Sequence, residues 1–219
     1  PVNNFNPLFI YGGVGLGKTH LLHAIGHEVD STWSQANVKC INAEQFTNEI
    51  INAIREGNTK DFKYNYRNVD MFLVDDVQFL AKTDAAQEEF YHTFNALYEK
   101  GKGTVFCSDS PPEEISTIEE RLRSRFGMGL TVDIQPPGYE TRVAILQQKA
   151  EQEGLTVPTN VIEYIAENLA GNVRQLESSL TRLGMKTSLS KERITVELAR
   201  EELSDLFDSA GSGSRQPLT

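Results

Sequence analysis

The sequence predicts an α/β fold: a three-layer domain with a parallel sheet between helices, followed by a small all-helical lid. Two observations lead to this prediction. Short apolar runs alternate with amphipathic helical segments in residues 1–137, which is typical of a parallel sheet covered on both faces. After Pro136 and Pro137 the pattern changes, and residues 138–207 show helical periodicity alone. We expect residues 208–219, which contain Gly-Ser-Gly-Ser, to form a flexible tail.

The individual elements follow from apolar runs, their periodicity and the turn residues between them. We expect strands at residues 8–11, 38–42, 69–74, 104–108 and 130–134. In the first domain we expect helices at residues 18–29, 43–56, 61–66, 85–100 and 118–126. In the lid we expect helices at residues 140–153, 160–169, 173–184 and 195–207.

Composition and charge limit the class of protein. The 219 residues carry a formal net charge of −10, so this chain is not expected to grip duplex DNA strongly by itself, because Lys and Arg supply most of that affinity. No apolar run approaches the roughly 18–20 residues of a membrane span. No signal peptide precedes the first strand, so we expect a cytoplasmic protein without a membrane span. Cys40 and Cys107 lack metal-ligand spacing and are expected to be reduced, structural thiols.

A glycine-rich segment follows the first predicted strand and opens the first helix. The residues that fit the pattern G-x-x-x-x-G-K-[ST] are Gly12, Gly13, Val14, Gly15, Leu16, Gly17, Lys18 and Thr19. The glycines let backbone N–H groups surround phosphate oxygens, and the start of the next helix favours the same anion. Lys18 can reach the β- and γ-phosphates, and the Thr19 hydroxyl can ligate Mg²⁺. We expect this segment and the adjacent His20 to bind ATP or ADP; the alternative is a glycine-rich structural turn.

An apolar strand that ends in two acids supplies the expected second half of the metal site. Residues 71–74 lead directly into Asp75 and Asp76. We expect Asp75 to hold Mg²⁺ through water, beside Thr19, and Asp76 to polarise the water that attacks the γ-phosphate. Many ATPases of this kind carry Glu at the second position, and Asp is one methylene shorter. The sequence therefore predicts slow, switch-like ATP hydrolysis.

Three further polar positions are candidates for sensing the γ-phosphate. Asp109 follows the strand at 104–108, where a polar sensor would lie; the alternative is a turn cap before Pro111. Arg121 and Arg125 are four residues apart and share a helix face, whereas Arg123 points elsewhere. Two aligned guanidinium groups suit phosphate or carboxylate recognition. The alternative for both is pairing with nearby glutamates or exposure to solvent.

Arg174 is the candidate in the lid. It lies near the expected start of a helix, after Gly171 and Asn172. A cation at this end is unfavourably placed in the field of the helix dipole, so its position is better explained if it faces an anion. The alternative is an ion pair with Glu177 at i,i+3.

Taken together, these motifs resemble the DnaA family of bacterial replication initiators, which are AAA+ ATPases. The segments that carry the resemblance are residues 6–26, 44–49, 66–70, 75–80, 87–97, 121–126 and 172–177. The resemblance implies a P-loop AAA+ fold with a helical lid, and ATP-bound copies that assemble head to tail at the replication origin. It implies that Arg125 is the arginine finger reaching the ATP of the neighbouring copy and that Arg121 supports this interface. It implies that Asp109 is sensor 1 and Arg174 is sensor 2 within the same copy.

The resemblance also implies a contact with single-stranded DNA. The family inserts two initiator-specific helices between its nucleotide-binding motifs, here at about residues 43–67. Ile51 lies where the family places an apolar contact to the strand, and Lys82 lies where the family tends to carry basic residues. In this sequence Lys82 is followed closely by an acid, Asp84.

The expected function is therefore an ATP-binding, slowly hydrolysing initiator core that forms ATP-dependent oligomers at the origin and engages single-stranded DNA to help open the duplex. The alternative is a truncated regulatory module that acts on a full-length initiator, so a full-length initiator and replication regulators are further expected partners. A helicase-loader ATPase is disfavoured by residues 121–126 and 172–177. No counterpart of the family's helix-turn-helix domain follows Phe207, so we expect a fragment, an engineered core or a natural truncated member.

Overall fold

The computed structural model of the chain describes residues 5–190 and 192–212, without the side chains of residues 81, 82, 190 and 209–212. The chain divides into two compact units, each with its own hydrophobic core. The first unit ends at Ile134 and the second begins at Gln135, next to the two prolines where the sequence pattern changes. The loop residues Val14–Leu16 group with the second unit.

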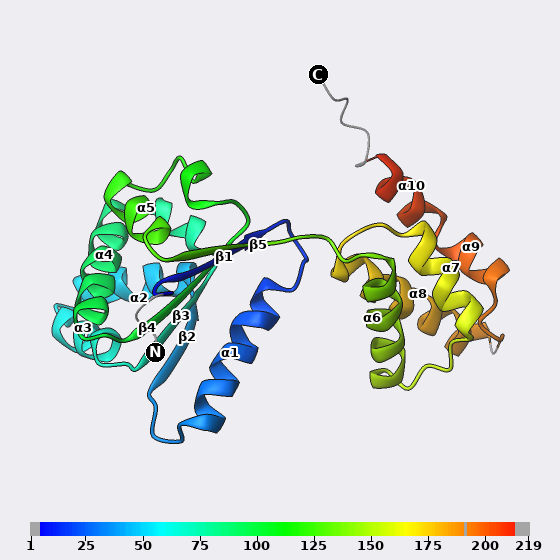
Figure 1. Cartoon of the computed structure of the whole chain (residues 1–219), viewed down its shortest axis with the longest axis horizontal. Coiled ribbons are helices and arrows are strands. Elements are labelled where there is room, and N and C mark those ends of the chain that lie inside the picture. Colours follow the sequence, from blue (N-terminus) through cyan, green and yellow to red (C-terminus); the bar gives the residue numbers. More distant parts are fainter. Residues whose placement is uncertain (1–4, 191, 213–219) are drawn as a thin grey trace. The chain divides into compact units, whose positions relative to one another are not determined.

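A five-stranded parallel sheet forms the centre of the first unit (Figure 1). Its strands are β1 (Leu8–Gly12), β2 (Val38–Asn42), β3 (Met71–Asp75), β4 (Gly103–Ser108) and β5 (Leu130–Ile134). The strand order is β2-β3-β4-β1-β5, so β3, β4 and β1 are neighbours in the middle of the sheet. Because parallel strands all point the same way, their carboxyl ends meet at one edge, where ligands of open α/β sheets bind.

Helices cover both faces of this sheet, with α1 alone on one face (Figure 1). The helices of the first unit are α1 (Lys18–Thr32), α2 (Ala43–Arg55), α3 (Thr59–Arg67), α4 (Asp84–Glu99) and α5 (Glu120–Gly127). Two 3-10 segments that the sequence analysis did not predict are η1 (Val77–Lys82) and η2 (Pro112–Glu114). Under α1 the core is aliphatic, with Leu22 of the helix packed among Ile10, Leu73 and Val105 of the strands. The predicted α/β class is confirmed.

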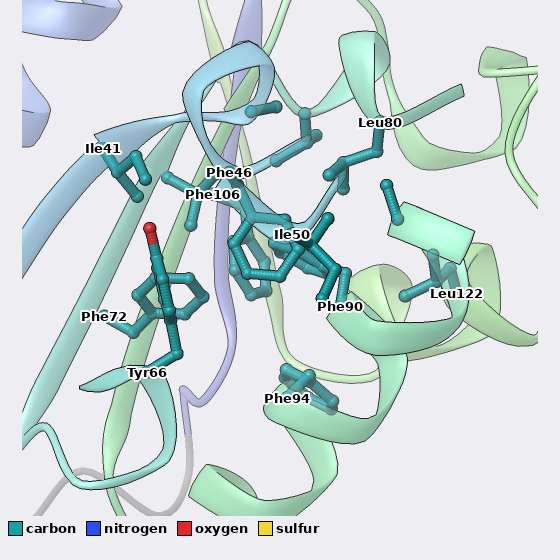
Figure 2. Packing of buried hydrophobic residues seen from close by; sticks show 14 of the residues in the cluster. Ile41, Phe46, Ile50, Tyr66, Phe72, Leu80, Phe90, Phe94, Phe106 and Leu122 are labelled. Carbon is teal, nitrogen blue, oxygen red and sulfur yellow. The ribbon is translucent and has the colours of Figure 1, made fainter. Parts of the chain in front are cut away.

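The core on the opposite face is aromatic (Figure 2). Phe46 of α2 lies at its centre and meets the rings of Phe62, Tyr66, Phe72 and Phe90 at centroid distances between 5.0 and 6.4 Å. These edge-to-face and tilted contacts are favourable geometries for aromatic pairs. Replacing such a fully buried phenylalanine by alanine typically costs about 3–5 kcal/mol of stability. The same cluster thereby fixes α2 and α3 to the sheet.

The second unit contains helices only among its described residues. They are α6 (Tyr139–Gln152), α7 (Thr159–Asn168), α8 (Val173–Ser190), α9 (Val196–Glu202) and α10 (Ser204–Ser212). Its core is aliphatic, and fully buried members include Leu146, Ile165, Leu176, Leu180 and Leu183.

Two predictions for the end of the chain need correction. The single helix expected at residues 195–207 is two helices, α9 and α10, because Leu203 leaves helical geometry (φ −112°, ψ 8°) while its side chain is buried in the core. The flexible tail expected at residues 208–219 is helical as far as Ser212. Extending a helix that has already formed costs little, so the small residues after Asp208 continue it. Residues 213–219 lie outside the described part of the chain.

Two other expectations can be compared with the structure. Both cysteines are free, but only Cys107 is buried, whereas Cys40 on β2 is exposed. The structural role expected for both thiols therefore holds for Cys107 alone. Within the described residues, no helix is long and apolar enough to cross a membrane.

Candidate nucleotide-binding site

The glycine-rich loop joins β1 to α1 and has a backbone that requires glycine. Gly12, Gly15 and Gly17 adopt positive φ angles of 157°, 77° and 91°. A Cβ atom on Gly12 would lie 2.5 Å from the carbonyl oxygen of Ile134, so close packing against β5 adds to the requirement. Gly17 occupies the N-cap of α1 and has no side chain with which to cap it. The first N–H groups of α1 are therefore suited to bind an anion.

Lys18 places its ammonium group inside this loop. Its Nζ atom donates to the carbonyl oxygens of Gly12 and Gly13 at 2.8 and 2.9 Å. The same atom forms an ion pair with Asp109 Oδ1 at 2.7 Å. The Lys18 side chain is only 7% exposed, so its charge is held among oxygen atoms and away from bulk water. A phosphate group entering the loop would meet a lysine that is already in place.

Thr19 and Asp75 form the pair expected at a magnesium site. The Thr19 hydroxyl donates to Asp75 Oδ2 at 2.5 Å, which joins the start of α1 to the end of β3. Hydroxyl and carboxylate oxygens are ligands that Mg²⁺ accepts, usually with nucleotide phosphates and water completing its shell. Among the described residues there is no group of three or more His, Cys, Asp or Glu side chains that could hold a metal by themselves. A hydroxyl beside a carboxylate fits a cation that arrives with a nucleotide, whose phosphate oxygens would complete its shell.

Asp76 follows Asp75 and has an unusual backbone. Its φ and ψ of 54° and 48° lie in the left-handed region, and it is the one non-glycine residue with positive φ in the described part of the chain. Such a conformation costs roughly 1–2 kcal/mol and clusters at functional sites. Burial raises the pKa of the Asp76 carboxyl, and the neighbouring charges of Asp75 and Asp109 raise it further. A carboxyl with a raised pKa is a better proton acceptor when ionised.

Asp109 directly follows β4 and faces the loop. Its Oδ1 accepts from Lys18, so the structure places it with the phosphate loop. Next to it, Gln78 on η1 directs its amide nitrogen toward Asp76 Oδ1 at 3.2 Å and Asp109 Oδ2 at 3.3 Å. Gln78 is not among the site residues that the sequence predicts. The available signal was a lone polar residue in the otherwise apolar segment from Val77 to Leu80.

Three neighbouring strands bring these groups together. Gly12 ends β1, Asp75 ends β3, and Asp109 follows the last residue of β4. The register pairs Tyr11 with Ser108, so the loop and Asp109 emerge side by side at the carboxyl edge of the sheet. The site thus contains a lysine suited to phosphate (Lys18) and a hydroxyl–carboxylate pair suited to a cation (Thr19 and Asp75). It also contains the carboxylates of Asp76 and Asp109. Such a set of groups can bind a nucleoside triphosphate and activate a water molecule against it.

The arginines of α5 share an aromatic partner. The guanidinium carbons of Arg121 and Arg125 lie 5.0 and 5.8 Å from the centroid of the Tyr91 ring on α4. Hydrogen bonds from Arg125 and Asn95 lower the pKa of Tyr91. Arg121 also contacts Glu119, which was the alternative expected for it. Arg123 is directed elsewhere and donates to the backbone carbonyl oxygens of residues 115 and 118.

The remaining candidates are placed as follows. His20 in the first turn of α1 is exposed, as is Thr19. Ile51 on α2 is half-buried, and the more exposed apolar side chain on this helix is Ile54, at 51%. The backbone of Lys82 ends η1, but its side chain lies outside the described part of the chain.

Arg174 lies in the first turn of α8, in the second unit. Its role as a nucleotide sensor stays a prediction. Glu177, its alternative partner, forms an ion pair with Lys149 of α6 at 2.7 Å.

Comparison with known proteins gives the family. Residues 1–133 match the family model described as the bacterial DnaA ATPase domain, and residues 140–203 match the model described as the Hda lid domain. A chromosomal replication initiator protein DnaA of Thermoanaerobacter sp. (strain X514) is 52% identical over 209 residues. The alignment covers 95% of this chain and 47% of the relative, so the chain spans about half the length of the curated relatives it matches.

Solved structures agree with this result. Domain III of the Thermotoga maritima replication initiation protein DnaA has a TM-score of 0.88 at 40% identity, covering 93% of this chain and 85% of that one. A replication initiator DnaA bound to AMPPCP and single-stranded DNA has a TM-score of 0.76 at 32% identity, covering 99% of this chain and 66% of that one. The glycine-rich loop with its lysine, the acids at the end of β3 and these matches lead to one conclusion: the chain belongs to the bacterial DnaA ATPase domain family and has its AAA+ fold.

Proposed function

We propose that this chain binds ATP with Mg²⁺, hydrolyses it slowly, and uses the bound ATP to assemble head to tail on single-stranded origin DNA. The observation that carries the proposal is the convergence of Lys18, Thr19, Asp75 and Asp109 at the ends of three adjacent strands. The solved relative that carries AMPPCP, an analogue of ATP, supports the choice of nucleotide.

Binding would use groups that are already in position. Lys18 would exchange its contact with Asp109 for the β- and γ-phosphate oxygens, and the N–H groups at the start of α1 would donate to the same phosphates. Thr19 would contribute its hydroxyl to Mg²⁺, and Asp75 would hold the ion through water. The bound cation would neutralise charge on the phosphate oxygens. His20, exposed beside Thr19, and Arg174 in the lid would complete the contacts.

Hydrolysis would depend on Asp76. A water oxygen attacks the γ-phosphorus, the bond between this phosphorus and the bridging oxygen breaks, and ADP leaves with that oxygen. The water proton passes to the Asp76 carboxylate, while Asp109 senses the γ-phosphate from the adjacent strand. We propose that the rate is slow because the Asp76 side chain is one methylene shorter than the glutamate of faster enzymes. A slow rate suits a switch that reports whether ATP is bound.

The second half of the site would come from a neighbouring copy. Arg125 would reach the γ-phosphate of the next copy as an arginine finger, and Arg121 would support the contact. Both lie on α5 beside Tyr91, and the described contacts of Arg125 are to neutral groups, the Tyr91 side chain and the Met128 sulfur at 3.8 Å. A guanidinium with such partners retains a strong preference for an anion.

The proposal includes contact with single-stranded DNA. The support is the solved relative that binds such a strand. In this chain, the initiator-specific helices α2 and α3 present Ile51 and the more exposed Ile54, and η1 ends at Lys82. With a net charge of −10, the chain is expected to bind DNA weakly as a single copy and more strongly as an assembly, in which contacts add along the strand.

Sedimentation of the chain with ATP, with ADP and without nucleotide tests the proposal, each sample with and without single-stranded DNA. We expect faster-sedimenting species with ATP alone and a further increase when DNA is added. ADP samples are the matched control, because they fill the loop without a γ-phosphate for Arg125. Identical monomers under all conditions would exclude assembly by this chain.

A second candidate function has one observation in its favour, the match of residues 140–203 to the Hda lid domain model. In this reading the chain is a truncated regulatory module that binds a full-length initiator. Mixed complexes with a full-length initiator, together with little assembly of the chain alone, would favour it in the same sedimentation experiment.

A further inference from the structure

Gln78 occupies a position in the candidate site that the proposed mechanism leaves without a role. It lies on η1, two residues after Asp76, between a buried Val77 and an exposed Phe79. Its amide nitrogen is 3.2 Å from Asp76 Oδ1 and 3.3 Å from Asp109 Oδ2. One side chain thus bridges the acid proposed to activate water and the acid proposed to sense the γ-phosphate.

The orientation of the Gln78 amide follows from its neighbours. The Asp76 and Asp109 carboxylates accept hydrogen bonds and do not donate them when ionised, so the NH₂ group must face them. This orientation leaves Oε1 buried and without a hydrogen-bond partner in the described part of the chain. A buried acceptor in this state does not stabilise the fold. The presence of Gln78 at this position is better explained by the contacts of its NH₂ group with Asp76 and Asp109.

These contacts continue as far as the phosphate loop. Asp109 accepts from Gln78 through Oδ2 and from Lys18 through Oδ1. Lys18, Asp109, Gln78 and Asp76 therefore form one chain of polar contacts, which runs from the group that would bind phosphate to the group that would accept the proton. When a γ-phosphate draws Lys18 away from Asp109, the Gln78 amide becomes the neighbouring donor that stays with Asp109.

We propose that Gln78 is a positioning residue for hydrolysis: it fixes the Asp76 carboxylate for water activation and couples its position to phosphate binding through Asp109 and Lys18. The inference rests on the proposed ATPase activity of this site. The left-handed backbone of Asp76 fixes the direction of its Cα–Cβ bond, and the hydrogen bond from Gln78 restrains the carboxylate beyond it. The Gln78 amide is a donor for this carboxylate that carries no charge, so it orients Asp76 without the strong stabilisation that a cation would give.

Gln78→Met tests the inference, because methionine has a similar length and shape but offers no N–H donor. We expect the single-turnover rate of ATP hydrolysis to fall at least tenfold while the dissociation constants of ATP and ADP change less than threefold. Gln45→Met is the matched control, since Gln45 on α2 also donates its amide to a carboxylate, Glu49 at 2.8 Å, at an exposed position, but contacts neither Asp76 nor Asp109 through that amide. It should leave the hydrolysis rate unchanged.

A double-mutant cycle with Asp76→Asn separates positioning from a general structural effect. If Gln78 acts through Asp76, Gln78→Met should cause no further loss in the Asp76→Asn background. An additive loss, a parallel loss of nucleotide affinity, or a hydrolysis rate within twofold of the unaltered chain would each overturn the inference. If the Gln78→Met variant melts at a much lower temperature, Gln78→Glu serves as the second variant, because glutamate keeps the shape of the side chain without its N–H donor. We expect Gln78→Glu to show the same fall in the rate of ATP hydrolysis. Absence of hydrolysis by the unaltered chain would remove the proposed ATPase activity, and this inference with it.

Discussion

The phosphate-loop side and the α5 side of the first unit hold their cationic groups in different ways. At the loop, Lys18 is almost fully buried and is surrounded by two carbonyl oxygens and the Asp109 carboxylate. On α5, Arg121 and Arg125 rest against the ring of Tyr91, and Arg121 is exposed. The loop lysine is thus positioned by charged and polar groups of its own fold, whereas the arginines are positioned by an aromatic surface.

This difference indicates which step each region controls. A buried lysine among oxygens is arranged before the nucleotide arrives, so its removal should affect binding by a single copy. Arg121 pairs with Glu119 and Arg125 contacts Tyr91 and Met128, but each guanidinium has five N–H donors, so some remain for a partner outside the chain. Removal of Arg125 should therefore affect only the step that involves a second copy. Substitutions on the two sides should therefore separate nucleotide affinity from assembly.

The largest effect is expected at the loop. Lys18→Ala should weaken ATP binding by about a hundredfold or more, because it removes charge-assisted hydrogen bonds worth about 1.5–3 kcal/mol each. Calorimetric titration of ATP into the chain measures the change. Stability should fall by about 1–3 kcal/mol, because the buried carbonyl oxygen of Gly12 loses its donor, whereas the Asp109 carboxylate, 42% exposed, stays hydrated.

Lys102→Ala is the matched control for this substitution. Lys102 pairs with Asp70 at 2.6 Å, and both residues precede strands, so they lie at the opposite edge of the sheet from the loop. The ATP affinity of the Lys102→Ala variant should equal that of the unaltered chain. Unchanged ATP affinity in Lys18→Ala would count against the assignment of the loop.

The next effect in size is expected on α5. Arg125→Ala should abolish ATP-dependent assembly while the affinity for ATP stays within about twofold, because the side chain acts on the nucleotide of another copy. Sedimentation with ATP measures the loss of assembly, and titration measures the affinity. If the Arg125→Ala variant still assembles with ATP, another residue must act as the arginine finger.

Arg123→Ala is the control on the same helix. Arg123 donates to the carbonyl oxygens of Ile115 and Ile118, so its loss should lower stability by about 1–3 kcal/mol through unsatisfied acceptors. Assembly with ATP should persist below the melting temperature of this variant. Together the two alanine variants distinguish an arginine that faces a partner from one that holds its own fold.

The sequence predicts most of what depends on local pattern. All five strands and the helices of the first unit lie within a few residues of their expected bounds, because apolar periodicity and glycine or proline breaks are local signals. The division of residues 195–207 at Leu203 could not be predicted in this way. It depends on burial of that side chain in a core formed by distant helices.

The same distinction applies to the candidate site. The residues proposed to bind the nucleotide and its cation, in the loop and at the end of β3, could be predicted from motif spacing, because the chemistry of phosphate and magnesium binding restricts residue types at fixed intervals. Gln78 and Tyr91 could not, because the contacts that suggest a role for them come from other elements: Asp109 after β4 for Gln78, and two arginines of α5 for Tyr91. The left-handed backbone of Asp76 also has no sequence signal, since aspartate adopts this region only occasionally.

The smallest effect concerns the aromatic surface under the arginines. Tyr91→Leu should weaken ATP-dependent assembly by about two- to fivefold, because each cation–π contact at a partly exposed ring contributes about 0.5–1 kcal/mol. Tyr91→Phe keeps the ring and loses the hydroxyl that accepts from Arg125, so it should show a smaller loss. The concentration of chain at half-maximal assembly with ATP measures both. ATP affinity of the single copy should be the same in all three proteins. Equal assembly by the leucine variant and the unaltered chain would mean that the arginines are positioned without the ring, and the contrast with the pre-arranged Lys18 would lose its basis.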